Sequence, residues 1–222
     1  MEDGMTPREF ERAEGTEDWR VVGDGVTAFF PATSFEESVA FVQAISELPA
    51  VVAHQPDVDI RKDGVTCRLV TVADDYFGPT QRDAEAAREI SAAARKLGLR
   101  ADPSAVQSVL VIPGAPVPGE VMPFWRAVLG YVPRPDSPDE DLVDPHDRGP
   151  ALWFERMDQP RPGGGGAIHV AVWVPYEEAR TRIDAALAAG GRIVRDQFAP
   201  AWWTLADAAG NEVDISTIAG RA

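Results

Sequence analysis

The succession of predicted strands and helices differs before and after the polar stretch RADPS, residues 100–104. This change constrains the fold more than any other feature of the sequence. A chain of 222 residues is long enough for two compact units of about 100 residues each. The stretch has the composition of a linker. We therefore expect two domains, residues 1–100 and residues 105–222.

The first half predicts the order strand, strand, helix, strand, helix. Alternating or β-rich stretches cover 19–22, 26–30 and 65–72, and helical patterns begin at Phe35 and Ala84. Apolar residues at helical spacing predict that the first helix turns one side towards the core, namely Phe35, Val39, Val42 and Ile45, with Pro49 ending the helix. This order predicts an α+β fold, an antiparallel sheet with helices on one face.

In the second half, the sequence predicts the same succession of a strand, a helix and further strands twice. A strand at 107–112 is followed by a short helix at 123–130 and by further strands, and a strand at 168–174 is followed by a helix at 176–189 and three strands. The two strand-helix-strand-strand units share little sequence identity. They indicate an internal structural repeat of paired βαβββ modules, again α+β.

Composition excludes several classes of function. The formal net charge of −15 opposes binding to nucleic acid or to an anionic membrane surface. No export signal and no apolar run of membrane-spanning length is evident, so we expect a cytoplasmic protein. Cys67 is the only cysteine, which excludes an internal disulfide and a zinc site built on several thiolates.

Three linked stretches of the first half carry a family resemblance: HQPDVDIR from His54, VTCRLVT from Val65 and GPTQRD from Gly78. Together they resemble the pterin-4a-carbinolamine dehydratases, which carry a His-His-Pro motif, a VTVRLTTH strand and a GLTERD turn. The resemblance covers roughly residues 5–98 and implies that family's α+β fold.

The resemblance also implies a site for dehydrating a 4a-hydroxytetrahydropterin. It makes His54 and Asp83 catalytic candidates, with Gln55 and Pro56 as ligand-binding residues. The family uses three histidines as proton-transfer groups, but Gln55 replaces the second and Val72 the third. A second interpretation stays open, in which His54 is a turn residue and Asp83 stabilises the start of a helix.

The second half resembles the vicinal oxygen chelate superfamily, most closely its glyoxalase-like bacterial members. The residues that carry this resemblance are FWRAVLGY from Phe124, ALWFE from Ala151, IHVAV from Ile168 and LADAAGNEVD from Leu205. They cover roughly residues 105–218 and imply the paired βαβββ fold. Isomerases, dioxygenases and drug-binding proteins all share this fold, so the resemblance leaves the reaction open.

Metal-using members of that superfamily take one ligand from each of four strands. Laid on this sequence, those positions fall on Gln107, Glu155, His169 and Asp214. Their oxygen and imidazole donors suit Zn²⁺, Ni²⁺, Mn²⁺ or Fe²⁺, although many glyoxalase-like members hold no metal. Trp153 and Trp173 are candidates for the apolar walls of a ligand cleft, with core packing as the alternative.

Three functions remain open at this stage. The first is a lyase, a 4a-hydroxytetrahydrobiopterin dehydratase with an incomplete histidine motif. The second is a metal-dependent lyase or isomerase in residues 105–222, and the third is a protein that binds and sequesters a small molecule. Each implies a small-molecule partner, and both resemblances imply a homodimer.

Overall fold

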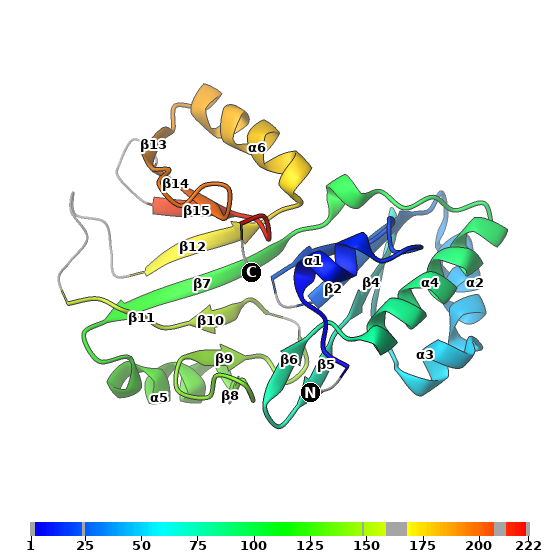
Figure 1. Cartoon of the computed structure of the whole chain (residues 1–222), viewed down its shortest axis with the longest axis horizontal. Coiled ribbons are helices and arrows are strands. Elements are labelled where there is room, and N and C mark those ends of the chain that lie inside the picture. Colours follow the sequence, from blue (N-terminus) through cyan, green and yellow to red (C-terminus); the bar gives the residue numbers. More distant parts are fainter. Residues whose placement is uncertain (1–2, 24, 148, 159–167, 207–211, 221–222) are drawn as a thin grey trace. The chain divides into compact units, whose positions relative to one another are not determined.

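The computed structural model describes residues 3–23, 25–147, 149–158, 168–206 and 212–220 (Figure 1). Contacts within the chain divide it into two compact units, with the main boundary between Val106 and Gln107. No helix in the described ranges is both long and apolar enough to cross a bilayer.

The first unit is built on a four-stranded antiparallel sheet with the strand order β1-β2-β4-β3. Its strands are β1 (Arg20–Val22), β2 (Gly25–Pro31), β3 (Asp57–Arg61) and β4 (Gly64–Leu69). A hairpin follows, formed by β5 (Thr71–Ala73) and β6 (Tyr76–Gly78). The helices are α1 (Pro7–Arg12), α2 (Phe35–Ser46), α3 (Pro49–Ala53) and α4 (Gln81–Lys96), with a short 3₁₀ turn at Pro103–Ala105.

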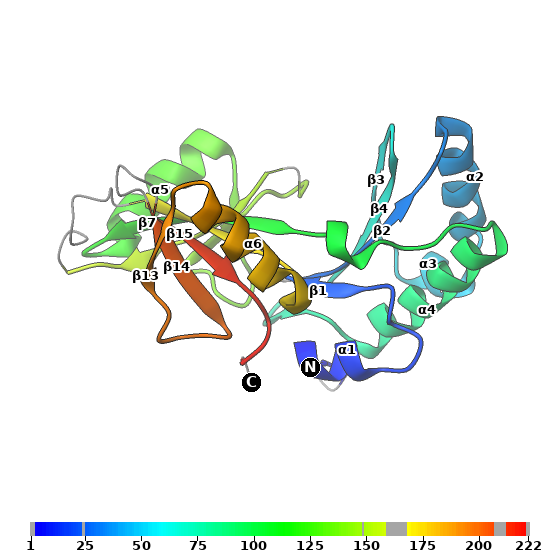
Figure 2. The same cartoon turned by 90° about the horizontal axis from the view of Figure 1, so that it is seen from above.

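Helices cover one face of this sheet, as Figure 2 shows for α2, α3 and α4. Alternate residues of β4, Val65, Cys67 and Leu69, are fully buried, because a strand directs successive side chains to opposite faces. The predicted α+β class, with helices on one face of an antiparallel sheet, is confirmed.

Aromatic side chains fill the core of the first unit. The rings of Trp19 and Phe30 meet edge to face at 6.4 Å, and those of Phe30 and Phe41 lie 4.9 Å apart. The buried Trp19 indole donates hydrogen bonds from Nε1 to the Ala87 carbonyl at 3.2 Å and to Ser91 Oγ at 3.1 Å. These bonds satisfy the indole and tie it to α4, the helix that carries Asp83.

The predicted buried side of α2 is wrong in part. Phe35 and Val39 are 64% and 42% exposed, whereas Ser38, Phe41 and Ile45 are buried. Pro49 does not end α2, which stops at Ser46, but begins the separate helix α3. Proline suits this first helical position, because its missing N–H would have no partner within the helix.

The second unit contains a nine-stranded mixed sheet within the described ranges. The order is β13-β14-β15-β12-β7-β10-β9-β8, and β11 also pairs with β7. The strands are β7 (Ser108–Ala115), β8 (Val132–Pro133), β9 (Asp141–Val143), β10 (Ala151–Trp153), β11 (Glu155–Arg156), β12 (Ile168–Trp173), β13 (Arg192–Arg195), β14 (Trp202–Ala206) and β15 (Glu212–Ser216).

The predicted internal repeat is visible in the strand order of this sheet. Helix α5 (Pro118–Leu129) follows β7 and leads to β8, β9 and the interrupted strand β10–β11, which pairs with β7 in one register. Helix α6 (Tyr176–Ala188) follows β12 and leads to β13, β14 and β15. β7 and β12 pair antiparallel at the centre, and each pairs in parallel with the last full strand of its own module, β10 or β15. Of the LADAAGNEVD stretch, residues 207–211 lie outside the described ranges.

The two faces of this sheet differ in chemistry. The face under the helices is apolar, with Leu152 and Phe154 packed near Met122 of α5, and Ile215 and Leu205 packed near Ile183 of α6. Strand alternation places Asp214 on the other face from Ile215, and the register places His169 on the other face from Val111. The predicted metal ligands His169 and Asp214 therefore lie on the face opposite the helices.

Burial of the single cysteine gives a prediction for the first unit. Cys67 is fully buried, and burial raises the pKa of its thiol to about 12. The thiolate is the reactive form, so we expect almost no reaction with 5,5′-dithiobis(2-nitrobenzoate) at pH 8 in the native protein. In urea the thiol should react fully, with a midpoint that matches the loss of circular dichroism. Rapid stoichiometric reaction of the native protein would contradict the buried position.

Candidate functional site

The end of α3 fixes the position of His54. His54 is the residue after the helix, and its N–H donates to the Ala50 carbonyl at 2.8 Å. At the other end of α3, the Ala50 N–H donates to the Glu89 carboxylate of α4 at 3.0 Å. An acid at a helix N-terminus satisfies a first-turn amide, so α4 holds the short helix whose last turn presents His54.

Asp83 is a fully buried carboxylate in the first turn of α4. Its Oδ2 accepts from the Thr80 N–H at 2.7 Å and from the Thr80 hydroxyl at 2.6 Å. This is one half of a capping box, in which the residue before the helix and the third helical residue satisfy each other. The predicted role of Asp83 as a stabiliser of a helix start is therefore part of the structure.

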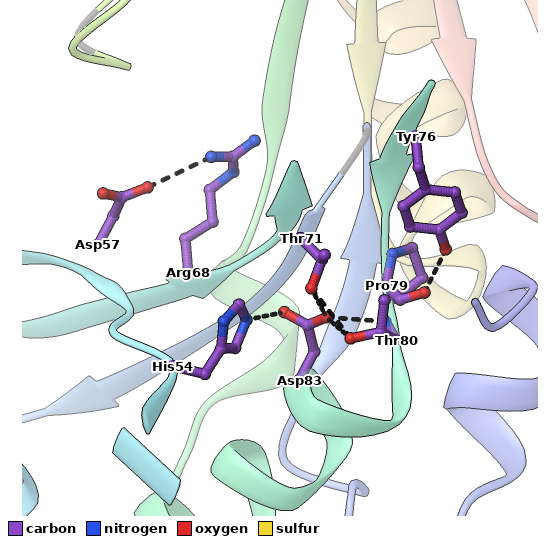
Figure 3. A network of polar contacts seen from close by, with 8 residues as sticks. All are labelled: His54, Asp57, Arg68, Thr71, Tyr76, Pro79, Thr80 and Asp83. Atoms are coloured by element: carbon purple, nitrogen blue, oxygen red, sulfur yellow. Dashed lines mark hydrogen bonds and ion pairs between the residues drawn. The ribbon is translucent and has the colours of Figure 1, made fainter. Parts of the chain in front are cut away.

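The same carboxylate also holds the histidine (Figure 3). His54 Nε2 lies 2.7 Å from Asp83 Oδ1, and the His54 side chain is 16% exposed while that of Asp83 is fully buried. Because a carboxylate oxygen accepts, Nε2 carries the hydrogen in this pair. The neutral ring then has its lone pair on Nδ1, which makes no hydrogen bond with any described residue.

Thr71 is a member of this network that the sequence did not indicate. Its hydroxyl donates to Asp83 Oδ2 at 2.8 Å and lies 2.9 Å from the Thr80 hydroxyl, and all three side chains are buried. The threonine comes from β5, immediately before Val72. A threonine in a strand is too common to single out, so its role follows only from the fold.

The neighbouring positions differ in exposure. Gln55 is exposed and Pro56 half-buried after His54, and Val72 is 52% exposed.

Tyr76 donates its hydroxyl hydrogen to the Pro79 carbonyl, which fixes the turn into α4, and burial raises the pKa of this phenol. Figure 3 also shows Arg68 paired with the exposed Asp57 at 3.4 Å, a long contact that contributes little.

In the second unit, two of the four predicted metal ligands lie together. His169 Nε2 is 3.3 Å from Asp214 Oδ2, and the Thr204 hydroxyl donates to Asp214 Oδ1 at 2.6 Å. His169 and Thr204 are buried and the Asp214 side chain is 13% exposed. Thr204, from β14 beside β15, is again a residue that the sequence did not single out.

The other two predicted ligands come from the segment before β7 and from β11. In the strand register, His169 lies opposite Ile112 of β7. Gln107 comes five residues before Ile112, roughly 17 Å away along the strand direction, and just before β7 begins. The Gln107 side chain accepts from Arg182 of α6 at 3.2 Å. Glu155 is on β11, which borders β7 on the side away from β12.

The predicted four-ligand cluster is therefore not seen among the described residues, and the metal site stays a prediction. The described residues contain no group of three or more His, Cys, Asp and Glu side chains that could hold a metal ion. A zinc site in an enzyme normally takes three protein ligands, and only His169 and Asp214 converge. Within the described ranges, this pair alone does not make up such a site.

The two tryptophans predicted to line a ligand cleft have different surroundings. Trp153 is 37% exposed and lines a cavity of about 1030 Å³ beside α5. Trp173 is half-buried on β12, opposite Ser108 and Ser216, and does not line that cavity.

Comparisons with known proteins match the two units separately. A family model described as Pterin 4 alpha carbinolamine dehydratase matches residues 3–93, and one described as Glyoxalase-like domain matches residues 108–216. A Nocardia farcinica protein named "Putative pterin-4-alpha-carbinolamine dehydratase" is 37% identical over 78 residues, 35% of this chain and 80% of its own length. A protein of the same name from Acidobacterium capsulatum is 32% identical over 89 residues, 40% of this chain and 95% of its own.

The shared role of Asp83 can be tested by Asp83→Asn. An amide cannot accept from His54, Thr71 and Thr80 together, and its NH₂ group would face buried donors. We expect the free energy of unfolding of the first unit to fall by about 1–3 kcal/mol. Differential scanning calorimetry measures the change, with Asp63→Asn in the exposed β3–β4 turn as the matched control. Equal midpoints for the two variants would contradict the network.

The contact of only two predicted ligands within the described residues predicts a low metal content. After saturation with Zn²⁺ or Ni²⁺ and dialysis without a chelator, elemental analysis should find far less than one equivalent, and His169→Ala should not change the value. One bound equivalent that disappears in His169→Ala would show that a third ligand completes the His169–Asp214 pair.

Proposed function

The chain belongs to the pterin 4 alpha carbinolamine dehydratase family through residues 3–93, and on that premise we propose that its first unit dehydrates a 4a-hydroxytetrahydropterin. The proposed proton-transfer group is His54. The second unit is a glyoxalase-like domain, and the activity is assigned to the first unit alone.

One observation carries this proposal: the 2.7 Å contact between His54 Nε2 and the fully buried carboxylate of Asp83. A buried carboxylate is a partner of the kind that orients a general base or acid. The carboxylate fixes the ring orientation and tautomer, as the aspartate of a Ser-His-Asp triad does for its histidine. His54 thus presents a fixed nitrogen, Nδ1, at a partly exposed position.

The reaction needs one proton removed and one delivered. In the proposed step, His54 Nδ1 accepts the proton of the pterin ring nitrogen beside the hydroxylated carbon. The nitrogen lone pair then forms the C=N bond as the carbon–oxygen bond breaks. The imidazolium returns its proton to the departing hydroxide, so the products are a quinonoid dihydropterin and water, and the enzyme is unchanged.

Asp83 assists this cycle without exchanging protons itself. While the ring is protonated, the adjacent carboxylate stabilises the imidazolium, and the bonds from Thr71 and Thr80 keep the carboxylate in place. Asp83 and Thr71 are therefore positioning residues. Only His54 meets the substrate directly in this proposal.

Two departures from the family pattern predict a slow enzyme. Gln55 can hydrogen-bond a pterin edge but cannot transfer a proton, and Val72 can do neither. General acid–base groups contribute about 10²–10⁴-fold each, so a site with one imidazole in place of three should turn over slowly. Both positions are accessible enough to accept a larger side chain, because Gln55 and Val72 are exposed.

The assay is dehydration of a 4a-hydroxytetrahydropterin, followed by the absorbance of the quinonoid product. His54→Ala should lower kcat by about 10²-fold or more, whereas His146→Ala, in an exposed turn of the second unit, should leave it unchanged. The double variant Gln55→His/Val72→His restores the family pattern and should raise kcat at least about tenfold. Undiminished turnover in His54→Ala would remove this residue from the mechanism.

A further inference from the structure

Helix α3 is too short to be stable by itself, and one neighbouring helix holds it at both ends. It has five residues, Pro49–Ala53, and packs beside α4 (Figures 1 and 2). At its start, Glu89 of α4 accepts from the Ala50 N–H at 3.0 Å. At its end, Asp83 of α4 accepts from His54 Nε2 at 2.7 Å. The two helices therefore run antiparallel, with one carboxylate of α4 at each end of α3.

The start of α3 has no capping side chain of its own. Leu48, the residue before the helix, makes no side-chain hydrogen bond to the first turn, and Pro49 has no N–H. The N–H of Ala50 is therefore the first backbone donor of the helix, and such donors have no partner within a helix. Glu89 supplies the missing acceptor, and its negative charge is favourable at this end of a helix.

Apolar packing fixes the rotation of α3 only weakly. Of its five residues, all of them described, Val51 alone is buried, whereas Val52 is 65% exposed. One buried side chain constrains rotation about the helix axis less than a wide apolar face would, and neighbouring residues in a helix point about 100° apart. A small rotation of α3 would therefore carry the His54 ring away from Asp83.

An unbroken chain of hydrogen bonds links Glu89 to His54. Glu89 accepts from the Ala50 N–H, and the carbonyl of Ala50 accepts from the His54 N–H at 2.8 Å. Both backbone groups of Ala50 are thus engaged, and the His54 backbone is fixed with them. Asp83 then meets a ring whose backbone position is already set.

We propose that Glu89 is a positioning residue for His54. It anchors Ala50, and through Ala50 it places the His54 backbone so that Nε2 reaches Asp83. Glu89 contacts no substrate and transfers no proton. Its effect on the ring follows from the geometry, whereas its effect on turnover rests on the proposed function. The bond to Ala50 needs an acceptor oxygen, so glutamine should replace Glu89 and leucine should not.

The test is nitrogen-15 and proton NMR of protein labelled at histidine, because a hydrogen-bonded Nε2 proton exchanges slowly with water. The His54 signal is assigned by its loss in His54→Ala. Glu89→Leu should make the His54 Nε2 proton exchange about tenfold faster, since the ring leaves Asp83 for part of the time. Glu89→Gln should keep the wild-type signal. Glu85→Leu, exposed one turn earlier on α4, is the matched control and should change nothing.

Turnover gives the functional measurement. In the dehydration assay, Glu89→Leu should lower kcat about tenfold with little change in KM, because a misplaced proton-transfer group slows the chemical step. Glu89→Gln should have a kcat near the wild-type value. A residue that only stabilised the fold would shift the unfolding midpoint without moving kcat or the Nε2 signal of the folded protein.

Hydrogen exchange in the unaltered protein adds a measurement that does not depend on how any variant folds. The first amides of a helix normally exchange fast, but the Ala50 amide should be protected by Glu89. An Ala50 amide that exchanges as fast as an exposed one overturns the inference. An unchanged Nε2 signal in folded Glu89→Leu overturns it as well.

The inference and the proposed function can fail separately. A protein without dehydratase turnover whose Nε2 signal changes in Glu89→Leu supports the positioning role and contradicts the proposed reaction. Turnover that is lost in His54→Ala but unchanged in Glu89→Leu supports the reaction and overturns the positioning role.

Discussion

The buried carboxylate of Asp83 is the interaction on which the first unit depends. A carboxylate removed from water is costly unless every oxygen has partners, and here Thr71, Thr80 and His54 supply them. The residues come from the β5–β6 hairpin, the start of α4 and the end of α3. One side chain therefore fixes the relative position of three segments and the orientation of the histidine at once.

This arrangement joins the two interpretations that the sequence left open. Asp83 is a helix-capping residue through Oδ2 and the partner of a histidine through Oδ1. One carboxylate thus caps the helix and orients His54, while the imidazoles that the family resemblance implies at positions 55 and 72 are replaced by glutamine and valine. Selection on the fold alone would require only the cap, which Thr80 and Asp83 form without His54.

Sequence patterns predicted correctly the features of the fold that depend on residues close together in the chain. The β-α-β-β-β repeat and the start of α4 followed from alternation, helical spacing and a Thr-x-x-Asp cap. Helix α3 was missed, because five residues after a proline carry no periodicity. The buried side of α2 was assigned to Phe35 and Val39 because apolar character was counted, whereas packing against the sheet selects Phe41 and Ile45.

Residues that meet across strands were the hardest to predict. Gln107 was assigned to the same site as His169 from family position alone, but the β7–β12 register places it at the other end of the strand pair. Thr71 and Thr204 each complete a carboxylate's hydrogen bonds from a neighbouring segment. Such partners depend on register and sheet order, which a single sequence does not specify.

The protonation of the His54 ring tests the central claim most directly. Nitrogen-15 NMR of the imidazole, in protein labelled at histidine, distinguishes Nε2–H from Nδ1–H and follows both nitrogens during titration with 7,8-dihydrobiopterin. The structure predicts an Nε2–H ring held by Asp83, whose Nδ1 resonance alone shifts when the pterin binds. A ring protonated on Nδ1, or one that does not respond to a bound pterin, would contradict the account.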